Sequence, residues 1–226
     1  MLEAGTMEEM DPVFTQLGEC KLAAVVMLDD VEHAVPLARA LMAGGVRAIE
    51  LTLRTEVALA GLARLAVEVP EMLVGGGTVL CADQVKAVYE AGADFGVSPG
   101  TNGKVIAAAK EIELPFAPGI ATPSDIETAL EFDCRVLKFF PADGMGGLSY
   151  LKGIAAPYRH LGLRYIPLGG VNEGNLAEYV ASPDVLAVGG SWLVPKAMMQ
   201  AENWGGIEAL AARASSRISS KAGRKR

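Results

Sequence analysis

Short apolar runs alternate along the chain with longer segments that have helical periodicity. Each run stops at a glycine, a proline or a small polar residue, which is typical of strands that end in turns. Eight runs fit this description: 22–28, 46–53, 72–74, 94–97, 116–117, 135–140, 164–168 and 185–188. From the third run onward the stops recur about every 23 residues, which is room for one strand, one helix and two short loops. The pattern therefore predicts a strand–helix unit that is repeated eight times.

Strands that alternate with helices pair in parallel, and eight such units close into a (β/α)8 barrel more naturally than they stay an open sheet. A doubly wound nucleotide-binding sheet is the alternative. It is disfavoured because Asp29-Asp30, and not Gly-x-Gly-x-x-Gly, follows the first run. The predicted fold class is α/β, a (β/α)8 TIM barrel with an extra N-terminal helix over 7–19 and a C-terminal helix over 205–219.

The chain of 226 residues, 51% of them hydrophobic, can bury a sizeable core. We expect a single (β/α)8 barrel domain over 1–226, with the barrel core at about 21–199 and a flexible basic tail over 219–226. The helix over 7–19 is expected to cover the bottom of the barrel.

The net charge is −7, from 20 basic and 27 acidic residues. This balance argues against a nucleic-acid partner, because phosphates need a basic surface. The sequence shows neither the roughly 20 apolar residues of a membrane helix nor a secretory leader, so no membrane partner is expected and a cytoplasmic location is predicted.

Cysteine and histidine are both scarce. Cys20, Cys81 and Cys134 lie far apart and are odd in number, so we expect ordinary buried or semi-buried thiols and no disulfide scaffold. His33 and His160 each lack a second ligand nearby and are expected to be structural or surface residues. The sequence therefore predicts chemistry without a metal.

Polar residues interrupt the second run. Glu50, Thr52 and Arg54 share one face of the segment 48–54, and aliphatic residues occupy the other. If the aliphatic face meets the helices, the three polar side chains point into the lumen, where an unpaired charge is costly. One interpretation is a structural Glu–Arg ion pair at the barrel mouth. The other is a site that uses these groups.

A lysine interrupts the sixth run. Lys138 stands between Leu137 and Phe139, and burial of an amine disfavours its charged form. An uncharged amine can attack a carbonyl carbon. Strands two and six lie opposite each other in an eight-stranded barrel, so Glu50 could face Lys138 and move the protons that imine formation requires. A buried Glu–Lys ion pair without catalytic function is the alternative.

Glycine-rich segments follow three of the predicted strands. Segment 75–78 ends in a threonine hydroxyl, and segments 168–170 and 188–191 follow strands seven and eight, where barrels commonly bind phosphate through backbone N–H groups. With Arg54 as a fork for a carboxylate, the predicted site holds a carboxylate at one end and a phosphate at the other.

These residues occur in motifs that together are highly specific. The motifs are Glu50-Leu51-Thr52-Leu53-Arg54-Thr55, Gly75-Gly76-Gly77-Thr78-Val79, Ser98-Pro99-Gly100, Pro118-Gly119-Ile120-Ala121-Thr122, Leu137-Lys138-Phe139-Phe140-Pro141 and Gly189-Gly190-Ser191-Trp192-Leu193. From about residue 21 to residue 199 the chain resembles the 2-keto-3-deoxy-6-phosphogluconate (KDPG) aldolases and the closely similar 4-hydroxy-2-oxoglutarate (KHG) aldolases.

The resemblance implies a role for each residue of the predicted site. Lys138 would be the Schiff-base lysine and Glu50 the general acid and base. The substrate-binding residues would be Arg54 and Thr78 for the carboxylate, Pro99 and Phe140 around the pyruvyl part, and Gly169, Gly170, Gly190 and Ser191 for the phosphate. The family is class I, works without metal or other cofactor, and is usually a homotrimer.

The sequence departs from the family pattern at two positions. Ala24 stands where the family often has proline, which we interpret as a packing difference. Leu168 stands where the family often has threonine, and leucine cannot hydrogen-bond to a substrate hydroxyl. The departure leaves open the stereochemical preference at C4 of the substrate and the dependence on a substrate phosphate.

The sequence thus predicts a lyase of carbohydrate metabolism, in the Entner–Doudoroff pathway. Its predicted reaction is reversible cleavage of KDPG to pyruvate and glyceraldehyde 3-phosphate. The nearest alternatives are KHG aldolase, which yields pyruvate and glyoxylate, and 2-keto-3-deoxy-6-phosphogalactonate aldolase. A metal-dependent pyruvate aldolase is disfavoured by the scarcity of histidine. A barrel that only binds a phosphosugar is a further alternative.

Overall fold

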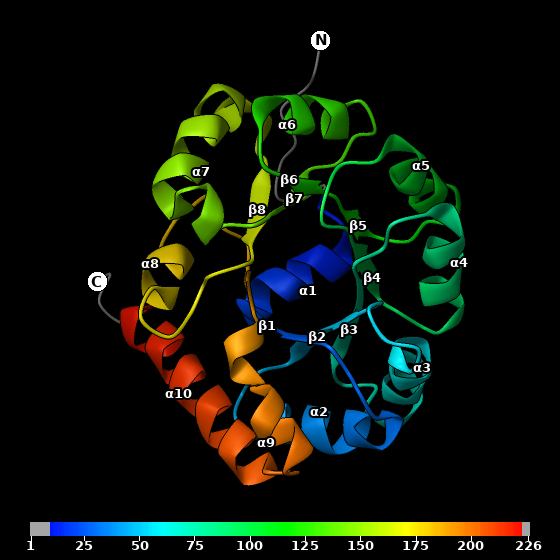
Figure 1. The fold of residues 1–226 in the computed structure, drawn as a ribbon. Coiled ribbons are helices and arrows are strands. Elements are labelled where there is room, and N and C mark those ends of the chain that lie inside the picture. Colours follow the sequence, from blue (N-terminus) through cyan, green and yellow to red (C-terminus); the bar gives the residue numbers. More distant parts are fainter. Residues whose placement is uncertain (1–9, 223–226) are drawn as a thin grey trace.

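The computed structural model describes residues 10–222, with side chains up to residue 218. Parallel strands surround a central axis and helices form an outer ring (Figure 1). The strands are β1 (Leu22–Val26), β2 (Ala48–Thr52), β3 (Leu73–Gly77), β4 (Phe95–Val97), β5 (Phe116–Ala117), β6 (Gly119–Ile120), β7 (Val136–Phe139), β8 (Arg164–Pro167) and β9 (Val188–Gly190).

The strands form two hydrogen-bonded groups, in the orders β5-β4-β3-β2-β1-β9 and β6-β7-β8. Pro118 separates β5 from β6. The two short strands together occupy the fifth position of the barrel, because β4 pairs with β5 and β7 pairs with β6. Bridges from Tyr165 to Val185 and from Leu168 to Gly189 join the two groups at the other side. The predicted (β/α)8 barrel is therefore confirmed.

Helices connect successive strands and cover the barrel. The α-helices are α1 (Pro12–Cys20), α2 (Ala34–Ala43), α3 (Ala58–Glu68), α4 (Ala82–Glu90), α5 (Gly103–Glu111), α6 (Pro123–Leu130), α7 (Gly147–Ala155), α8 (Leu176–Val180), α9 (Lys196–Gln200) and α10 (Trp204–Ala222). Short 3-10 helices are η2 (Val31–His33), η3 (Asp143–Met145), η4 (Ala156–Leu161) and η5 (Ser191–Leu193).

Helix α1 closes the end of the barrel at which the strands begin. Its first turn is fixed by Asp11, whose Oδ1 accepts the N–H of Val13 at 2.8 Å, and by Pro12 at the first helical position. Phe14 and Leu17 of α1 are buried in one cluster with residues of the strands and of the segment before β9: Ala23, Ala48, Leu73, Phe95, Val97, Ala117, Val136, Ile166, Leu186 and Ala187. This cluster fills the lower lumen and leaves the upper lumen for polar groups.

The helix over 7–19 was predicted to cover the barrel's bottom, and α1 confirms that position. Its described part begins at Pro12, and residues 7–9 lie outside the described residues. At the other end of the chain, α10 continues to Ala222, so the tail predicted from residue 219 is helical up to that point. Residues 223–226 lie outside the described residues.

Three glycines that the sequence pattern places in a loop belong instead to β3. Residues 75–77 pair with both β2 and, in part, β4. A side chain at Gly75 would collide with the Phe95 ring, one at Gly76 with Val88, and one at Gly77 with Glu50. Glycine is present here because large neighbours approach the strand closely, and not because the chain turns. For the same reason the prediction that strand three ends before Gly75 is wrong.

The last strand shows the same behaviour. Gly189 and Gly190 lie in β9 and pair with Ala23 and Ala24 of β1. The space beside Gly189 is filled by Leu168, and the space beside Gly190 is filled by Trp192. Of the segment 188–191, which was predicted to follow strand eight, only Ser191 lies after the strand.

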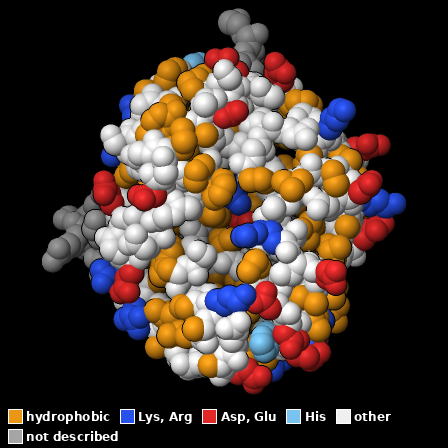
Figure 2. Space-filling view, in the orientation of Figure 1, with side chains coloured by type: hydrophobic (Ala, Val, Ile, Leu, Met, Phe, Trp, Pro, Cys, Tyr) orange, Lys and Arg blue, Asp and Glu red, His pale blue; other side chains and the backbone are white. Residues whose placement is uncertain are grey.

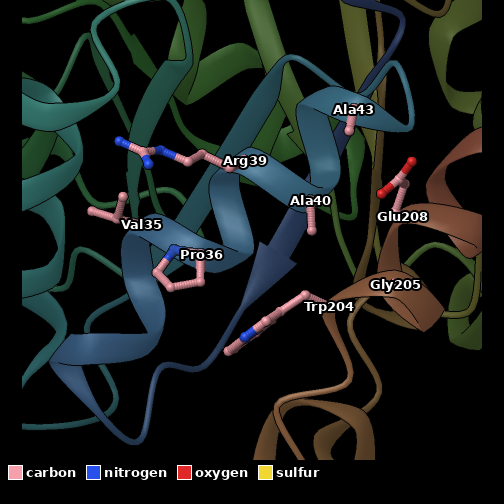
Figure 3. Close-up of a pocket in the computed structure, with 8 residues that line it drawn as sticks. All are labelled: Val35, Pro36, Arg39, Ala40, Ala43, Trp204, Gly205 and Glu208. Carbon is pink, nitrogen blue, oxygen red and sulfur yellow. The ribbon is translucent and has the colours of Figure 1, made fainter.

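Helix α10 lies against α2 on the outside of the barrel (Figure 1). The close approach requires a glycine at residue 44, since a side chain there would collide with Ala211, and Ser215 Oγ donates to the Gly44 carbonyl at 2.9 Å. Where the two helices diverge they leave a groove of about 420 Å³, into which Trp204 extends from the start of α10 (Figure 3). The residues lining this groove do not belong to the barrel interior.

The scarce cysteines and histidines are dispersed. All three cysteines are free. Cys20 and Cys134 are half-buried, and burial raises the pKa of the Cys134 thiol to about 11. Cys81 is exposed, so the prediction of a buried or semi-buried thiol is wrong at that position. His33 contacts the Trp204 ring edge-on, with ring centres 5.4 Å apart, and His160 is exposed in η4.

The position of α1 leads to a first prediction. Phe14→Ala removes a buried ring from the lumen cluster and should lower the free energy of unfolding by about 3–5 kcal/mol. Urea unfolding followed by circular dichroism measures this loss. Gln16→Ala, on the exposed side of the same helix, is the control and should change the value by less than about 0.5 kcal/mol. Equal losses in the two variants would mean that α1 does not seal the barrel.

Candidate active site

A buried ion pair crosses the upper lumen of the barrel. Lys138 projects inward from β7 and Glu50 from β2, and Lys138 Nζ donates to Glu50 Oε1 at 2.9 Å. Both residues are only 4% exposed. In Figure 2 the middle of the face is hollowed, and basic and acidic side chains lie in the hollow. The prediction that Glu50 and Lys138 face each other across the lumen is confirmed.

Strand alternation places both groups. In β7, Val136 belongs to the lumen cluster, whereas Leu137 and Phe139 are fully buried in the core outside the strands. Lys138, two residues after Val136, therefore points inward. In β2 the same alternation puts Ala48 in the lumen cluster and Glu50 one layer above it. Apolar packing of the neighbouring residues thus holds the amine and the carboxylate in the interior.

Glycine in β3 creates the space for the carboxylate. Gly77 pairs with Thr52 in the register of β2 and β3, and the Glu50 side chain occupies the place that a side chain at position 77 would need. The sequence pattern assigned Gly77 to an anion-binding loop and missed this role. The sequence feature that could have indicated this role is a glycine on the strand that neighbours the strand of Glu50.

The surroundings of Lys138 include an aromatic ring. The Phe140 ring centre lies 5.7 Å from Nζ, within the range in which an aromatic face attracts an ammonium group. Glu50 Oε1 is in direct contact with the same amine. The pair therefore combines an aromatic wall with a direct path along which one proton can move between Nζ and Oε1.

Arg54 and Thr78 lie in the loops that follow β2 and β3. Because β2 ends at Thr52, the strand does not extend to Arg54, which is exposed in the turn that follows. Thr78 is half-buried with φ of 58°. The Leu53 N–H donates to the Gly77 carbonyl at 2.8 Å and joins the two loops at the mouth of the barrel.

Pro99 lies two residues after the end of β4, and Phe140 directly follows β7. Both residues are half-buried. The backbone of Pro99 passes so close to Gly119 that a side chain at Gly119 would collide with it. Ser98, which is 3% exposed, donates through Oγ to the Gly100 carbonyl at 2.7 Å and fixes the turn that contains Pro99.

The loop after β8 turns sharply at two glycines. Gly169 and Gly170 have φ of 95° and 87°, a region that favours glycine. Their carbonyls are engaged, since Gly169 accepts the N–H of Asp143 at 2.8 Å and Gly170 accepts Asn172 Nδ2 at 3.0 Å. Gly169 follows Leu168, which is bridged to Gly189 of β9, whereas the Gly170 N–H donates to no other described residue. The loop therefore leaves the Gly170 N–H available.

The other two residues predicted to bind phosphate lie beside this loop. Gly190 is the last residue of β9, and Ser191 is exposed at the start of η5. The bridge between Leu168 and Gly189 brings the two segments together. Leu168 is buried against Gly189, on the inward side of the strand end, so an aliphatic side chain forms this part of the site wall.

No three histidine, cysteine, aspartate or glutamate side chains among the described residues lie close enough together to hold a metal ion. In residues 10–222 no helix is long and apolar enough to cross a membrane.

The barrel and its buried amine–carboxylate pair define the class of the chain: a (β/α)8-barrel lyase of the lysine-dependent, class I type. A family model described as KDPG and KHG aldolase matches residues 13–210. The chain therefore belongs to the KDPG/KHG aldolase family, which confirms the resemblance stated above.

Three relatives illustrate the similarity. The 2-dehydro-3-deoxy-phosphogluconate aldolase of Treponema pallidum is 45% identical over 201 residues, which is 89% of this chain and 95% of the relative. KDPG aldolase of Legionella pneumophila, with pyruvate captured as a covalent carbinolamine, is 38% identical with a TM-score of 0.82, covering 88% of this chain and 95% of that one. The aldolase of Zymomonas mobilis with 3-phosphoglycerate is 36% identical with a TM-score of 0.84, covering 93% and 96%.

The contact between Gly77 and Glu50 generates a second prediction. Gly77→Ala would place a methyl group where the Glu50 carboxylate lies, so the Nζ–Oε1 contact must lengthen. We expect kcat for cleavage of KDPG to fall by about 10²-fold or more, the loss expected when a general acid–base group is misplaced. Steady-state kinetics with KDPG measures the effect.

Gly153→Ala is the control for this prediction, because a side chain at Gly153 in α7 would meet nothing within 4 Å. It should retain the wild-type kcat. Wild-type turnover by Gly77→Ala would contradict the prediction that Glu50 needs the space beside Gly77 for catalysis.

Proposed function

We propose that the protein is a class I aldolase that cleaves KDPG to pyruvate and glyceraldehyde 3-phosphate through a Schiff base on Lys138. The observation that carries this proposal is the buried contact of 2.9 Å between Lys138 Nζ and Glu50 Oε1 in a chain of the KDPG/KHG aldolase family. One group supplies the nucleophile and the other moves the protons, which is the minimum that imine chemistry requires.

The first half of the reaction forms the imine. Glu50 accepts a proton from the Lys138 ammonium group across their contact, and the neutral amine attacks the C2 ketone of the substrate. The resulting carbinolamine loses its hydroxyl group as water after Glu50 returns a proton to it. The product is a protonated imine, with Glu50 again ionised. The carbinolamine in the Legionella relative supports this order of steps.

The second half breaks the carbon–carbon bond. Ionised Glu50, directly or through one water, removes the proton of the C4 hydroxyl, and the C3–C4 electron pair moves into the protonated imine. Glyceraldehyde 3-phosphate leaves and an enamine remains on Lys138. Glu50 then donates its proton to C3, which gives the protonated imine of pyruvate. Hydrolysis of this imine by one water releases pyruvate and restores the Lys138 ammonium group. Bonds and protons balance over the cycle.

The other residues of the proposed site bind the two ends of the substrate. Arg54 and Thr78, on neighbouring loops, would bind the carboxylate, and Pro99 and Phe140 would enclose the pyruvyl part. The Gly169–Gly170 loop, in which the Gly170 N–H donates to no other described residue, would hold the phosphate together with Gly190 and Ser191. The 3-phosphoglycerate in the Zymomonas relative supports a phosphorylated substrate. The resemblance further leads us to propose a cytoplasmic homotrimer.

Trapping of the imine is the direct test of this function. Sodium borohydride with pyruvate should reduce the imine and attach mass to the peptide that contains Lys138, as read by peptide mass spectrometry. Lys138→Ala should give no adduct and no turnover. Glu50→Gln should lower kcat by about 10²–10⁴-fold and still form some adduct.

Lys86→Ala, an exposed lysine in α4, is the matched control and should behave as wild type. An adduct on another residue, or one that persists in Lys138→Ala, would contradict the assignment. Substrate binding without turnover by the wild type would favour the alternative of a barrel that only binds phosphosugars.

A panel of four substrates tests the preference for KDPG. The panel comprises KDPG, its C4 epimer 2-keto-3-deoxy-6-phosphogalactonate, the unphosphorylated analogue of KDPG, and KHG. We expect kcat/KM to be highest for KDPG. Because the leucine at position 168 cannot hydrogen-bond, Leu168→Thr should change the ratio between the two epimers by about tenfold, the value of one hydrogen bond.

Leu168→Val is the control for this change, because it alters the volume and adds no hydroxyl. Equal changes in Leu168→Thr and Leu168→Val would contradict a role for the hydroxyl. A kcat/KM highest for KHG would favour the alternative KHG aldolase.

A further inference from the structure

The side chain proposed to bind the substrate carboxylate has no partner of its own. Arg54 is exposed, and it forms no ion pair with any described residue. A long side chain that is not held by a neighbour has many rotamers, and fixing them on binding costs free energy. The position of the guanidinium at the mouth therefore depends on how firmly the backbone of the turn is held.

Two threonine hydroxyls on either side of Arg54 hold this turn. Thr55 Oγ1 donates to the Leu28 carbonyl at 2.6 Å, and Thr52 Oγ1 donates to the Val26 carbonyl at 3.1 Å. Both acceptors belong to β1 or to the loop that follows it. The turn is therefore joined to the end of β1 before Arg54 and to the loop that follows β1 after Arg54.

The turn also has backbone contacts. Arg54 N–H donates to the Thr52 carbonyl at 2.7 Å, and Leu53 N–H donates to the Gly77 carbonyl at 2.8 Å. The contact from Leu53 joins the turn to the β3 side, where Thr78 lies. Thr55 provides the contact after Arg54 and joins it to the β1 side. The other contact after Arg54 is the longer bond from the Ala58 N–H to the Thr55 carbonyl, 3.4 Å, which joins the turn to α3 and not to the β1 side.

The acceptor of Thr55 lies in a loop that is itself anchored. Asp29, next to Leu28, forms an ion pair with Lys196 at 3.0 Å, and Lys196 is the first residue of α9. The loops after β1, after β2 and after β9 are thereby linked around one side of the barrel mouth. Leu28 itself is fully buried, so the carbonyl that accepts from Thr55 belongs to a packed segment.

We propose that Thr55 is a positioning residue for the carboxylate-binding end of the site: its hydroxyl fixes the turn so that Arg54 is presented toward the substrate. The inference rests on the proposed function, because it takes Arg54 as the carboxylate binder. It predicts that loss of the hydroxyl weakens binding of the carboxylate and leaves imine formation at Lys138 intact.

The test uses pyruvate, whose carboxylate Arg54 would bind and whose ketone Lys138 would attack. The pyruvate concentration that gives half of the maximal borohydride adduct on Lys138 is measured for wild type, Thr55→Val, Thr55→Ser and Arg54→Ala. Valine keeps the branched shape and removes the donor. We expect Thr55→Val to raise the half-saturating concentration about five- to tenfold, with the maximal adduct unchanged.

Rescue and coupling separate a positioning role from general destabilisation. Thr55→Ser restores the hydroxyl and should return the value to within about twofold of wild type. Arg54→Ala should raise it at least as much as Thr55→Val. If Thr55 acts through Arg54, adding Thr55→Val to Arg54→Ala should give no further increase. Thr55→Ala replaces Thr55→Val if the valine variant does not fold.

Thr128→Val is the control, since it removes a similar hydroxyl-to-carbonyl bond of 2.9 Å in α6 and should leave the half-saturating concentration unchanged. An unchanged value in Thr55→Val, or an equal increase in the Arg54→Ala background, would overturn the inference. A wild type that forms no adduct would instead contradict the proposed function, and an Arg54→Ala variant with wild-type behaviour would contradict the role of Arg54 and the inference with it.

Discussion

The structure depends on one contact, the ion pair between Lys138 and Glu50 inside the barrel. Each charge would be costly to bury alone, and the attraction between the two charges offsets part of the free energy lost on removing them from water. A hydrophobic pair of similar volume would serve stability as well or better. A buried charge pair therefore indicates chemistry more than stability. The surrounding barrel brings the two strands to the separation at which a proton can pass directly between the groups.

Much of the remaining architecture provides this contact with space and a floor. Apolar side chains from α1 and from the lower strand layers fill the lumen beneath the pair. Gly77 leaves a gap on β3 into which the Glu50 carboxylate fits. The outer residues of β7, Leu137 and Phe139, are packed under the helices and keep Lys138 turned inward. Packing thus holds the amine and the carboxylate in contact in the absence of substrate.

The sequence predicts those features that follow from alternation and spacing. The eight strand positions, the facing of Glu50 and Lys138, and the helix below the barrel all follow from which residues are apolar and how often they recur. Glycine was harder to interpret, because residues 75–77 could mark a turn or a close approach, and only the positions of Phe95 and Glu50 in space decide between them. The second strand was drawn two residues too long, to Arg54, because the sequence does not state where a strand ends. The anchoring by Thr55 joins segments whose contact becomes visible only in three dimensions.

The buried pair acts on atoms that related 2-keto-4-hydroxy acids share, namely the C2 ketone and the C4 hydroxyl. It therefore cannot by itself distinguish one substrate from another. Discrimination must come from the mouth, where loops after different strands contact the ends of the substrate and can vary without disturbing the core. Leu168 lies at the boundary between the two regions, buried against Gly189 below the Gly169–Gly170 turn. A reaction centre that acts on shared atoms, with substrate ends contacted only at the rim, is consistent with a family that includes both KDPG and KHG aldolases.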